Sequence, residues 1–309
     1  MQNPDPNRGA IVLAGGGELG IAWQSGLVAG LLEEGVDLRS ATTIVGTSAG
    51  SVVGSRLAGG VDMREVADHL AAREGDSAAT AAGPLEAQHP AATPEALAAA
   101  FGRLLERFAA GEAEGQSSAE LGAFALTASE IPEEVFRDTL AARLRIDGDF
   151  PASLRVATID TASGDLVVLD HASEMPLAHA VAASCSIPGI FPPITSPDGR
   201  RLMDGGVRSV TNADVILDTD PGPALIVDTL FEGAPEGTLF HTWLRRTERE
   251  IAQLHEAGFE PILIRASTED HMAMGFNPMD GSKAPAACEA GRARGRREAA
   301  SAASDPWRT

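Results

Sequence analysis

Apolar positions along the first part of the chain alternate between two spacings. A short apolar run at 10–14 predicts a buried strand, helical spacing of apolar residues follows from 21 to 34, and a β-branched run at 42–45 predicts a second strand. A glycine-rich stretch lies between the first strand and the helix. Strand, loop, helix and strand in this order form a βαβ unit, which predicts a parallel sheet with a right-handed crossover.

The later part of the chain continues the alternation of strands and helices. We expect further strands at 154–159, 166–169, 201–203, 224–229 and 261–265, and further helices at 51–57, 61–73, 132–144, 177–185, 236–255 and 284–300. These elements predict one α/β domain for the 309 residues. The Ala-, Gly- and Glu-rich stretch 74–116 is interpreted either as an inserted helical cap or as a solvated surface helix on slack loops, and the tail 301–309 as frayed.

The first candidate for chemistry is Ser48, in the pentapeptide Gly46-Thr47-Ser48-Ala49-Gly50. This G-x-S-x-G pattern stands between a predicted strand and a predicted helix, so the serine lies on a tight turn and its hydroxyl projects from the sheet edge. The positive end of the helix dipole then favours negative charge beside Ser48. The pattern predicts a nucleophile; the alternative is a small-residue turn that packs a helix closely on a sheet.

The glycine loop that follows the first strand has three interpretations. Gly15, Gly17 and Gly20 satisfy the G-x-G-x-x-G pattern of dinucleotide-binding sites, but the acidic residue expected at the end of the second strand is absent. A tight structural turn is the second interpretation. The third is an oxyanion hole, because parallel strands end at one sheet edge and the loop would lie beside Ser48. We favour the third.

A serine nucleophile also needs a base within hydrogen-bond reach. None of the seven histidines lies in a context that marks a catalytic loop. Asp204 follows a short predicted strand and precedes Gly205-Gly206, where a sharp turn can expose the carboxylate. An ordinary Asp-Gly turn explains the same residues, so their spacing does not decide between the two.

Charge and composition narrow the classes of partner. A net charge of −20 disfavours nucleic acids and gives no standing attraction to anionic membranes. Two distant cysteines form neither a disulfide framework nor a zinc site, and no cluster has metal-ligand spacing, so we expect no metal or cofactor. The first residues lack a signal-peptide layout and no apolar run is long enough to span a membrane, which predicts a cytoplasmic protein.

Four stretches taken together carry a resemblance to a known family. GGGELG after the first strand, GTSAG after the second, ASCSIPGIFPPI, and then MDGGV resemble the patatin-like phospholipases in order and spacing over about residues 10–215. The strand pair VATIDTASGDLVVL and Asn212 add to the likeness. The resemblance implies a three-layer α/β/α fold with a mostly parallel central sheet.

The same resemblance implies a Ser-Asp dyad without histidine. Ser48 would be the nucleophile, Asp204 its base, and the N–H groups of Gly15, Gly16 and Gly17 the oxyanion hole. The chain would then be a serine acyl-ester hydrolase, a phospholipase A-like esterase, that acts on lipid or other acyl-ester substrates with transient membrane or micelle contact.

One departure and two alternatives go with this expectation. Many relatives carry a basic residue in the glycine loop, where this chain has Glu18-Leu19, so phospholipids and neutral esters both remain candidate substrates. The alternatives are a nucleotide-binding protein that uses Gly15–Gly20 and a non-catalytic lipid-binding module of the same fold.

Overall fold

The computed structural model describes most of the chain. The described residues are 9–72, 89–90, 93, 95–97, 99–100, 102–103, 118–144 and 148–308. The predicted cap at 74–116 lies outside them except for the few positions between 89 and 103.

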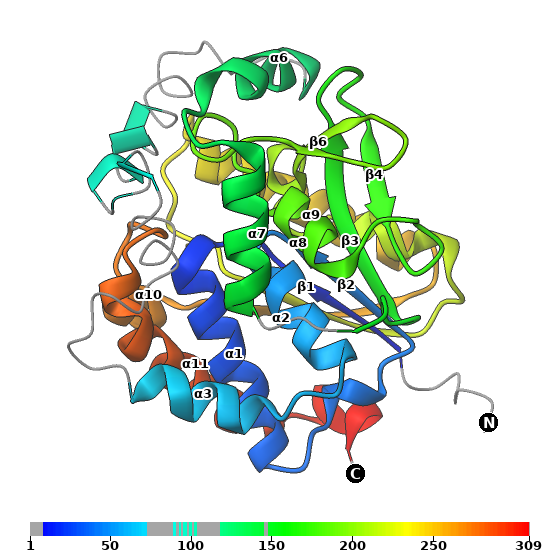
Figure 1. Ribbon diagram of the computed structural model, residues 1–309. Helices are drawn as coiled ribbons and strands as arrows, with labels where there is room; N and C mark the ends of the chain where they lie inside the picture. The colour runs from blue at the N-terminus through cyan, green and yellow to red at the C-terminus, as the bar shows by residue number, and fades with distance from the viewer. Residues whose placement is uncertain are drawn as a thin grey trace.

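An eight-stranded sheet forms the centre of the molecule (Figure 1). Its strands are β1 (Ala10–Leu13), β2 (Thr43–Thr47), β3 (Leu154–Asp160), β4 (Leu166–Leu169), β5 (Ile194–Thr195), β6 (Arg201–Asp204), β7 (Pro223–Asp228) and β8 (Glu260–Arg265). Their order is β5-β6-β3-β2-β1-β7-β8, with β4 paired to β3. The run from β3 to β8 is parallel, whereas β4 and β6 are antiparallel to β3 and β5 is antiparallel to β6. The predicted βαβ unit and mostly parallel sheet are confirmed.

Helices cover both faces of this sheet. They are α1 (Gly17–Glu33), α2 (Ala49–Ala58), α3 (Met63–Ala71), α6 (Ser118–Ala128), α7 (Glu133–Leu144), α8 (Leu177–Ser184), α9 (Leu239–Glu256), α10 (Thr268–Met274) and α11 (Ala284–Ala299). Figure 1 shows α1, α2, α3 and α7 in front of the sheet and α9 behind it. The arrangement is the expected three-layer α/β/α fold.

The burial of β1 explains why its sequence is apolar throughout. Ile11 and Leu13 join the core cluster that includes Trp23 of α1, whereas Val12 faces the second cluster, with Leu254 of α9. Strands covered on both faces have no polar side, so they appear as continuous apolar runs rather than as an alternating pattern.

Glycines line the contact between the first and last α-helices. Gly26 and Gly30 on α1 face Gly291 and Gly295 on α11, and a Cβ on any of the four would overlap a main-chain oxygen of the other helix. The two backbones therefore touch along this seam, and the seam tolerates only glycine at these positions.

The predicted fraying of residues 301–309 is wrong for the described part of this tail. Residues Ala302–Trp307 form a 3-10 helix, and the Trp307 indole is buried. The Asp37 N–H donates to the Trp307 carbonyl at 2.8 Å, and Val36 and Arg308 form a β-bridge. A single large aromatic side chain holds the tail down, although the residues around it are small or polar.

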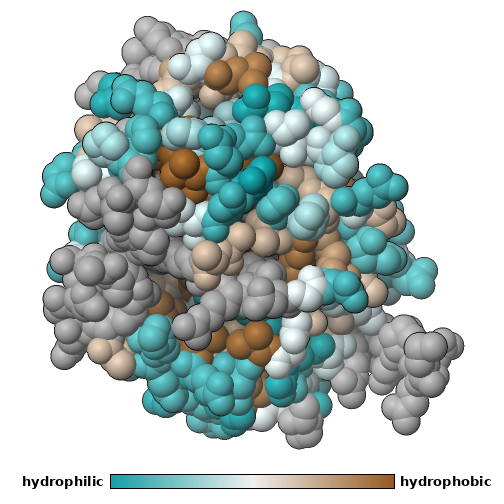
Figure 2. All heavy atoms as spheres, viewed as in Figure 1, coloured by the Kyte–Doolittle hydropathy of each residue, from teal (hydrophilic) through white to brown (hydrophobic). Residues whose placement is uncertain are grey.

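Among the coloured atoms of Figure 2, hydrophilic residues are the most widespread, and strongly hydrophobic residues show in separate patches. Among the described helices, none is both long and apolar enough to cross a lipid bilayer.

Candidate active site

Ser48 lies at the junction of β2 and α2, as the pattern predicted. Its backbone has φ 50° and ψ −116°, a left-handed conformation that is strained for any residue with a side chain. The neighbouring glycines permit the turn: a Cβ on Gly50 would overlap the Leu13 carbonyl, and one on Gly46 would lie 2.5 Å from the Ser51 Cα. The fold thus holds the Ser48 hydroxyl out from the end of the strand.

Strand register brings Asp204 level with Ser48. Thr47, the last residue of β2, pairs with Ala157 of β3, and the next residue of β3, Thr158, pairs with Asp204 of β6. Asp204 therefore stands opposite the position that follows Thr47, with only β3 between them. The Ser48 hydroxyl is within hydrogen-bond reach of the Asp204 carboxylate.

The turn after β6 shapes the environment of Asp204. The Gly206 N–H donates to Asp204 Oδ1 at 2.7 Å, and Gly205 is required because a Cβ there would lie 2.6 Å from the Ala157 carbonyl oxygen. Burial raises the pKa of Asp204 to about 7, while the hydrogen bonds from the Gly206 N–H and the Ser48 hydroxyl lower it. A carboxylate with a pKa near neutrality is suited to accept a proton from a hydroxyl.

Ser184, at the end of α8, ties these parts together and was not singled out from the sequence. Its buried hydroxyl accepts the Ser48 N–H at 2.8 Å and donates to the Ala157 carbonyl at 2.7 Å. Two residues on, the Ser186 carbonyl accepts the Asp204 N–H at 3.1 Å. The segment Ala-Ser-Cys-Ser was visible in the sequence as part of a motif, but its hydrogen bonds were not.

The glycine loop lies beside Ser48, with one correction to the expected oxyanion hole. A Cβ on Gly15 would lie 3.6 Å from the Ser48 Cβ. The Gly15 N–H, however, donates to the Val210 carbonyl at 2.8 Å, so it is not available to an oxyanion, and its predicted role is wrong. Within the described part of the chain, no hydrogen bond engages the Gly16 or Gly17 N–H, and these two remain candidates.

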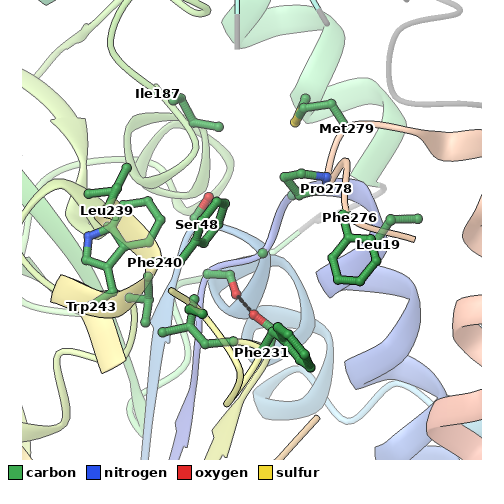
Figure 3. A pocket seen from close by; sticks show the side chains of 18 of the residues that line it. Leu19, Ser48, Ile187, Phe231, Leu239, Phe240, Trp243, Phe276, Pro278 and Met279 are labelled. Atoms are coloured by element: carbon green, nitrogen blue, oxygen red, sulfur yellow. Dashed lines mark hydrogen bonds between the residues drawn. The ribbon is translucent and has the colours of Figure 1, made fainter. Parts of the chain in front are cut away.

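A cavity of about 390 Å³ opens beside Ser48 and Asp204. Its wall is mostly apolar and includes Leu19, Ile187, Val210, Leu230, Phe231, Leu239, Phe240, Trp243, Met274, Phe276, Pro278 and Met279. Figure 3 shows Ser48 between Leu239 and Trp243 on one side and Leu19 and Phe276 on the other. A second hollow of about 50 Å³ also reaches Ser48 and is lined by Glu18 and Cys185 among others.

His271 is the one histidine that lines the larger cavity, and all seven are described. Its ring meets Phe231 edge-on, with ring centroids 5.2 Å apart, and stacks on Phe276 at 6.2 Å. Burial lowers the pKa of His271, so the ring is neutral at pH 7. Sequence reasoning gave no sign that this histidine would reach the site, because α10 was not predicted.

Cys185 lies within hydrogen-bond reach of Ser48 and Ser51. Burial raises the pKa of the Cys185 thiol, so it stays protonated at neutral pH and has little nucleophilic character. Both cysteines are free, and the described residues include no group of three or more His, Cys, Asp or Glu side chains that could hold a metal ion.

Comparison with protein families finds a match over the part of the chain that contains Ser48 and Asp204. The family model described as Patatin-like phospholipase matches residues 11–217, more than half of the 309. The chain belongs to this family. Both candidate reacting residues of the patatin-like chain lie inside the matched range, whereas the part of the cavity wall from Phe231 to Met279 lies beyond it.

Two solved structures show distant likeness to the patatin-like chain. VipD from Legionella pneumophila has 16% identity and a TM-score of 0.45, with 96% of this chain and 67% of that one covered. The type III effector protein ExoU has 19% identity and a TM-score of 0.35, with 96% and 54% covered. Neither likeness is close enough for a shared function to follow. No curated protein matches the chain in sequence.

Proposed function

We propose that this patatin-like protein is a serine hydrolase that cleaves acyl esters of lipids. The observation that carries the proposal is the pairing of the Ser48 hydroxyl with the buried Asp204 carboxylate at the wall of an apolar cavity. Membership of the patatin-like phospholipases supports a lipid substrate. The cavity has the size range of small-molecule sites and suits an acyl chain.

The reaction would proceed through an acyl-enzyme. Asp204 takes the proton as the Ser48 oxygen attacks the ester carbonyl, and a tetrahedral oxyanion forms beside the Gly16 and Gly17 N–H groups. Its collapse breaks the ester bond, and Asp204 returns the proton to the departing alcohol. Water, deprotonated by Asp204, then attacks the acyl-enzyme and releases the carboxylic acid and free Ser48.

Two further parts of the proposal concern where the enzyme acts. The acyl ester is taken from a micelle or membrane in transient contact, because an apolar chain must leave a lipid phase to fill the cavity. Two free thiols fit a reducing cytoplasmic location.

Covalent labelling tests the function directly. A fluorophosphonate should label the wild-type protein at Ser48, which peptide mapping identifies, and both Ser48→Ala and Asp204→Asn should abolish or strongly slow labelling. Hydrolysis should persist in EDTA, because neither proposed step uses a metal ion.

The opposite results would favour the rival functions. A folded wild-type protein that never labels, or label that maps to another residue, contradicts the proposal and leaves the non-catalytic lipid-binding module. A thermal shift with NAD or ATP in the absence of labelling would favour a nucleotide site at Gly15–Gly20.

A further inference from the structure

The glycine loop presents its amide groups unequally. The Ala14 N–H donates to the Val227 carbonyl at 3.0 Å, and the Gly15 N–H donates to the Val210 carbonyl at 2.8 Å. The N–H of Gly16 has no hydrogen-bond acceptor among the described residues. Gly16 therefore provides the first amide after β1 that can face a substrate.

The direction of this amide follows from the peptide that carries it. The Gly15–Gly16 peptide is trans, so its C=O and N–H point in opposite directions. The Thr229 hydroxyl donates a hydrogen bond to the Gly15 carbonyl. Any group that fixes the carbonyl on one side of the loop thus directs the Gly16 N–H to the other side.

Sheet order identifies the two sides. The loop follows β1, Thr229 follows β7, and Ser48 follows β2, and β1 lies between β7 and β2. A Gly15 carbonyl held on the β7 side therefore turns the Gly16 N–H toward the β2 side, where Ser48 lies.

The glycine loop needs a group that fixes the orientation of the Gly15–Gly16 peptide. Gly16 has φ 151° and ψ 12°, a conformation that residues with a side chain rarely adopt, and glycines on both sides of the peptide let it rotate at little cost. The hydroxyl also fits closely: a Cβ on Gly16 would lie 2.7 Å from Thr229 Oγ1.

Thr229 is itself held firmly. It is buried, and the preceding residue, Asp228, accepts the Leu230 N–H at 2.9 Å and the Arg265 Nε at 2.9 Å. A hydroxyl on a fixed backbone can hold a carbonyl that has no rigid support of its own.

We propose that Thr229 is a positioning residue of the oxyanion hole, whose hydroxyl holds the Gly15 carbonyl and so directs the Gly16 N–H at the oxygen that becomes negative when Ser48 attacks. This inference rests on the hydrolase function proposed above. The positioning role belongs to the Thr229 hydroxyl oxygen and not to its methyl group.

Three variants in the full chain test it. Thr229→Val removes the hydroxyl and keeps the shape, Thr229→Ser keeps the hydroxyl, and Thr42→Val is a matched control. Thr42 Oγ1 donates to the Gly9 carbonyl at 2.9 Å, the same kind of hydrogen bond at the opposite end of β1. The measurements are kcat and KM on a soluble acyl ester and the rate of fluorophosphonate labelling.

The expected pattern separates positioning from general packing. Thr229→Val should lower kcat and the labelling rate about 10–100-fold with KM within about twofold of wild type, because a misdirected donor stabilises only the transition state. Thr229→Ser should stay within about threefold of wild-type kcat, and Thr42→Val within about twofold.

Equal kcat for Thr229→Val and Thr42→Val, or a Thr229→Ser variant as slow as Thr229→Val, would overturn the inference. Where valine prevents folding, the pair Thr229→Ser and Thr229→Ala differs by one hydroxyl and should differ about tenfold in kcat; equal values again overturn it. Absence of Ser48-dependent labelling in wild type is the separate result that defeats the proposed function itself.

Discussion

Residues 9–217 and residues 218–308 make different contributions to one site. The first region holds Ser48 after β2 and Asp204 at the end of β6, on either side of β3. The pairing register of these strands places the two residues level with each other. The second supplies much of the cavity wall, including Phe231, Trp243 and Phe276. The proposed reacting groups are positioned by main-chain pairing, whereas the wall is formed by side chains of loops and helices.

This difference has a functional meaning. The family match ends at residue 217, so the part matched to the patatin-like family is the part that holds the proposed reacting groups, Ser48 and Asp204. The wall beyond it can vary without disturbing strand register. We therefore expect changes at Ser48 and Asp204 to affect all substrates alike, and changes in the cavity-wall side chains of the second region to affect them according to their acyl chain; Thr229, which holds the glycine loop, belongs with the first group in this respect.

The strongest test of the first region is Asp204→Asn. The asparagine is the same size and still accepts the Gly206 N–H, but it cannot take a proton. We expect kcat to fall about 10²–10⁴-fold for every acyl length, measured with esters of increasing chain. His271→Phe, which keeps a ring in the wall, is the discriminating control: if it abolishes turnover and Asp204→Asn does not, the histidine is the base.

The pH profile sharpens the same assignment. Burial raises the pKa of Asp204 to about 7, and the base works only when deprotonated. Going down in pH through about 7 should therefore protonate it, and kcat/KM should fall about tenfold for each further pH unit. A profile that stays flat down to pH 5 would be incompatible with Asp204 as the base.

A smaller and more selective effect is expected in the second region. Trp243→Ala removes a wall side chain that packs edge-on against Phe240, with ring centroids 5.7 Å apart. We expect kcat/KM to fall about tenfold for long acyl chains, which lose apolar contact, and to change less than about twofold for acetyl esters. Equal losses for both would mean that this wall does not bind the chain.

The smallest effect concerns stability. Ser48→Gly and Ser48→Ala both remove the nucleophile, but only glycine relieves the backbone strain at φ 50°. We expect the glycine variant to have a free energy of unfolding about 1 kcal/mol larger than the alanine variant in urea titrations. Asn212→Gly is the contrast: its φ of 47° suits asparagine, whose two amide hydrogens are shared among three oxygens within hydrogen-bond distance, so glycine there should destabilise. If Ser48→Gly is no more stable than Ser48→Ala, the turn stores no strain.

The same contrast explains what the sequence could predict. The position of Ser48 at a strand-to-helix turn could be predicted, because strand, turn and helix leave local signals in neighbouring residues. The spacing of residues alone did not decide the role of Asp204. Its position relative to Ser48 depends on the pairing of β6 with β3, which no local sequence pattern encodes. Gly15 was misassigned because the acceptor of its N–H, the Val210 carbonyl, comes from a distant part of the chain.

The cavity wall could not be read from the sequence at all. Leu230 and Phe231 stand in a loop without periodicity, and α10, which brings His271 and Met274, has only seven residues and buries the polar Asp270 and His271 together with Met274. The prediction for the tail was wrong for a similar reason. The Trp307 carbonyl accepts the Asp37 N–H, and Arg308 forms a β-bridge with Val36, so the tail is held by residues far away in the sequence. Contacts between remote segments decide each of these cases.

The glycine seam between α1 and α11 sets the order in which the proposed active site can become complete during synthesis. α1 begins at the glycine loop, and the face it presents to α11 stays uncovered until residues 284–299 have left the ribosome. Contacts between segments that are far apart in the sequence form late and slow folding. A nascent chain therefore carries Ser48 and Asp204 long before α1 is locked in place, and the proposed activity should arise only after residues 284–299 have emerged from the ribosome.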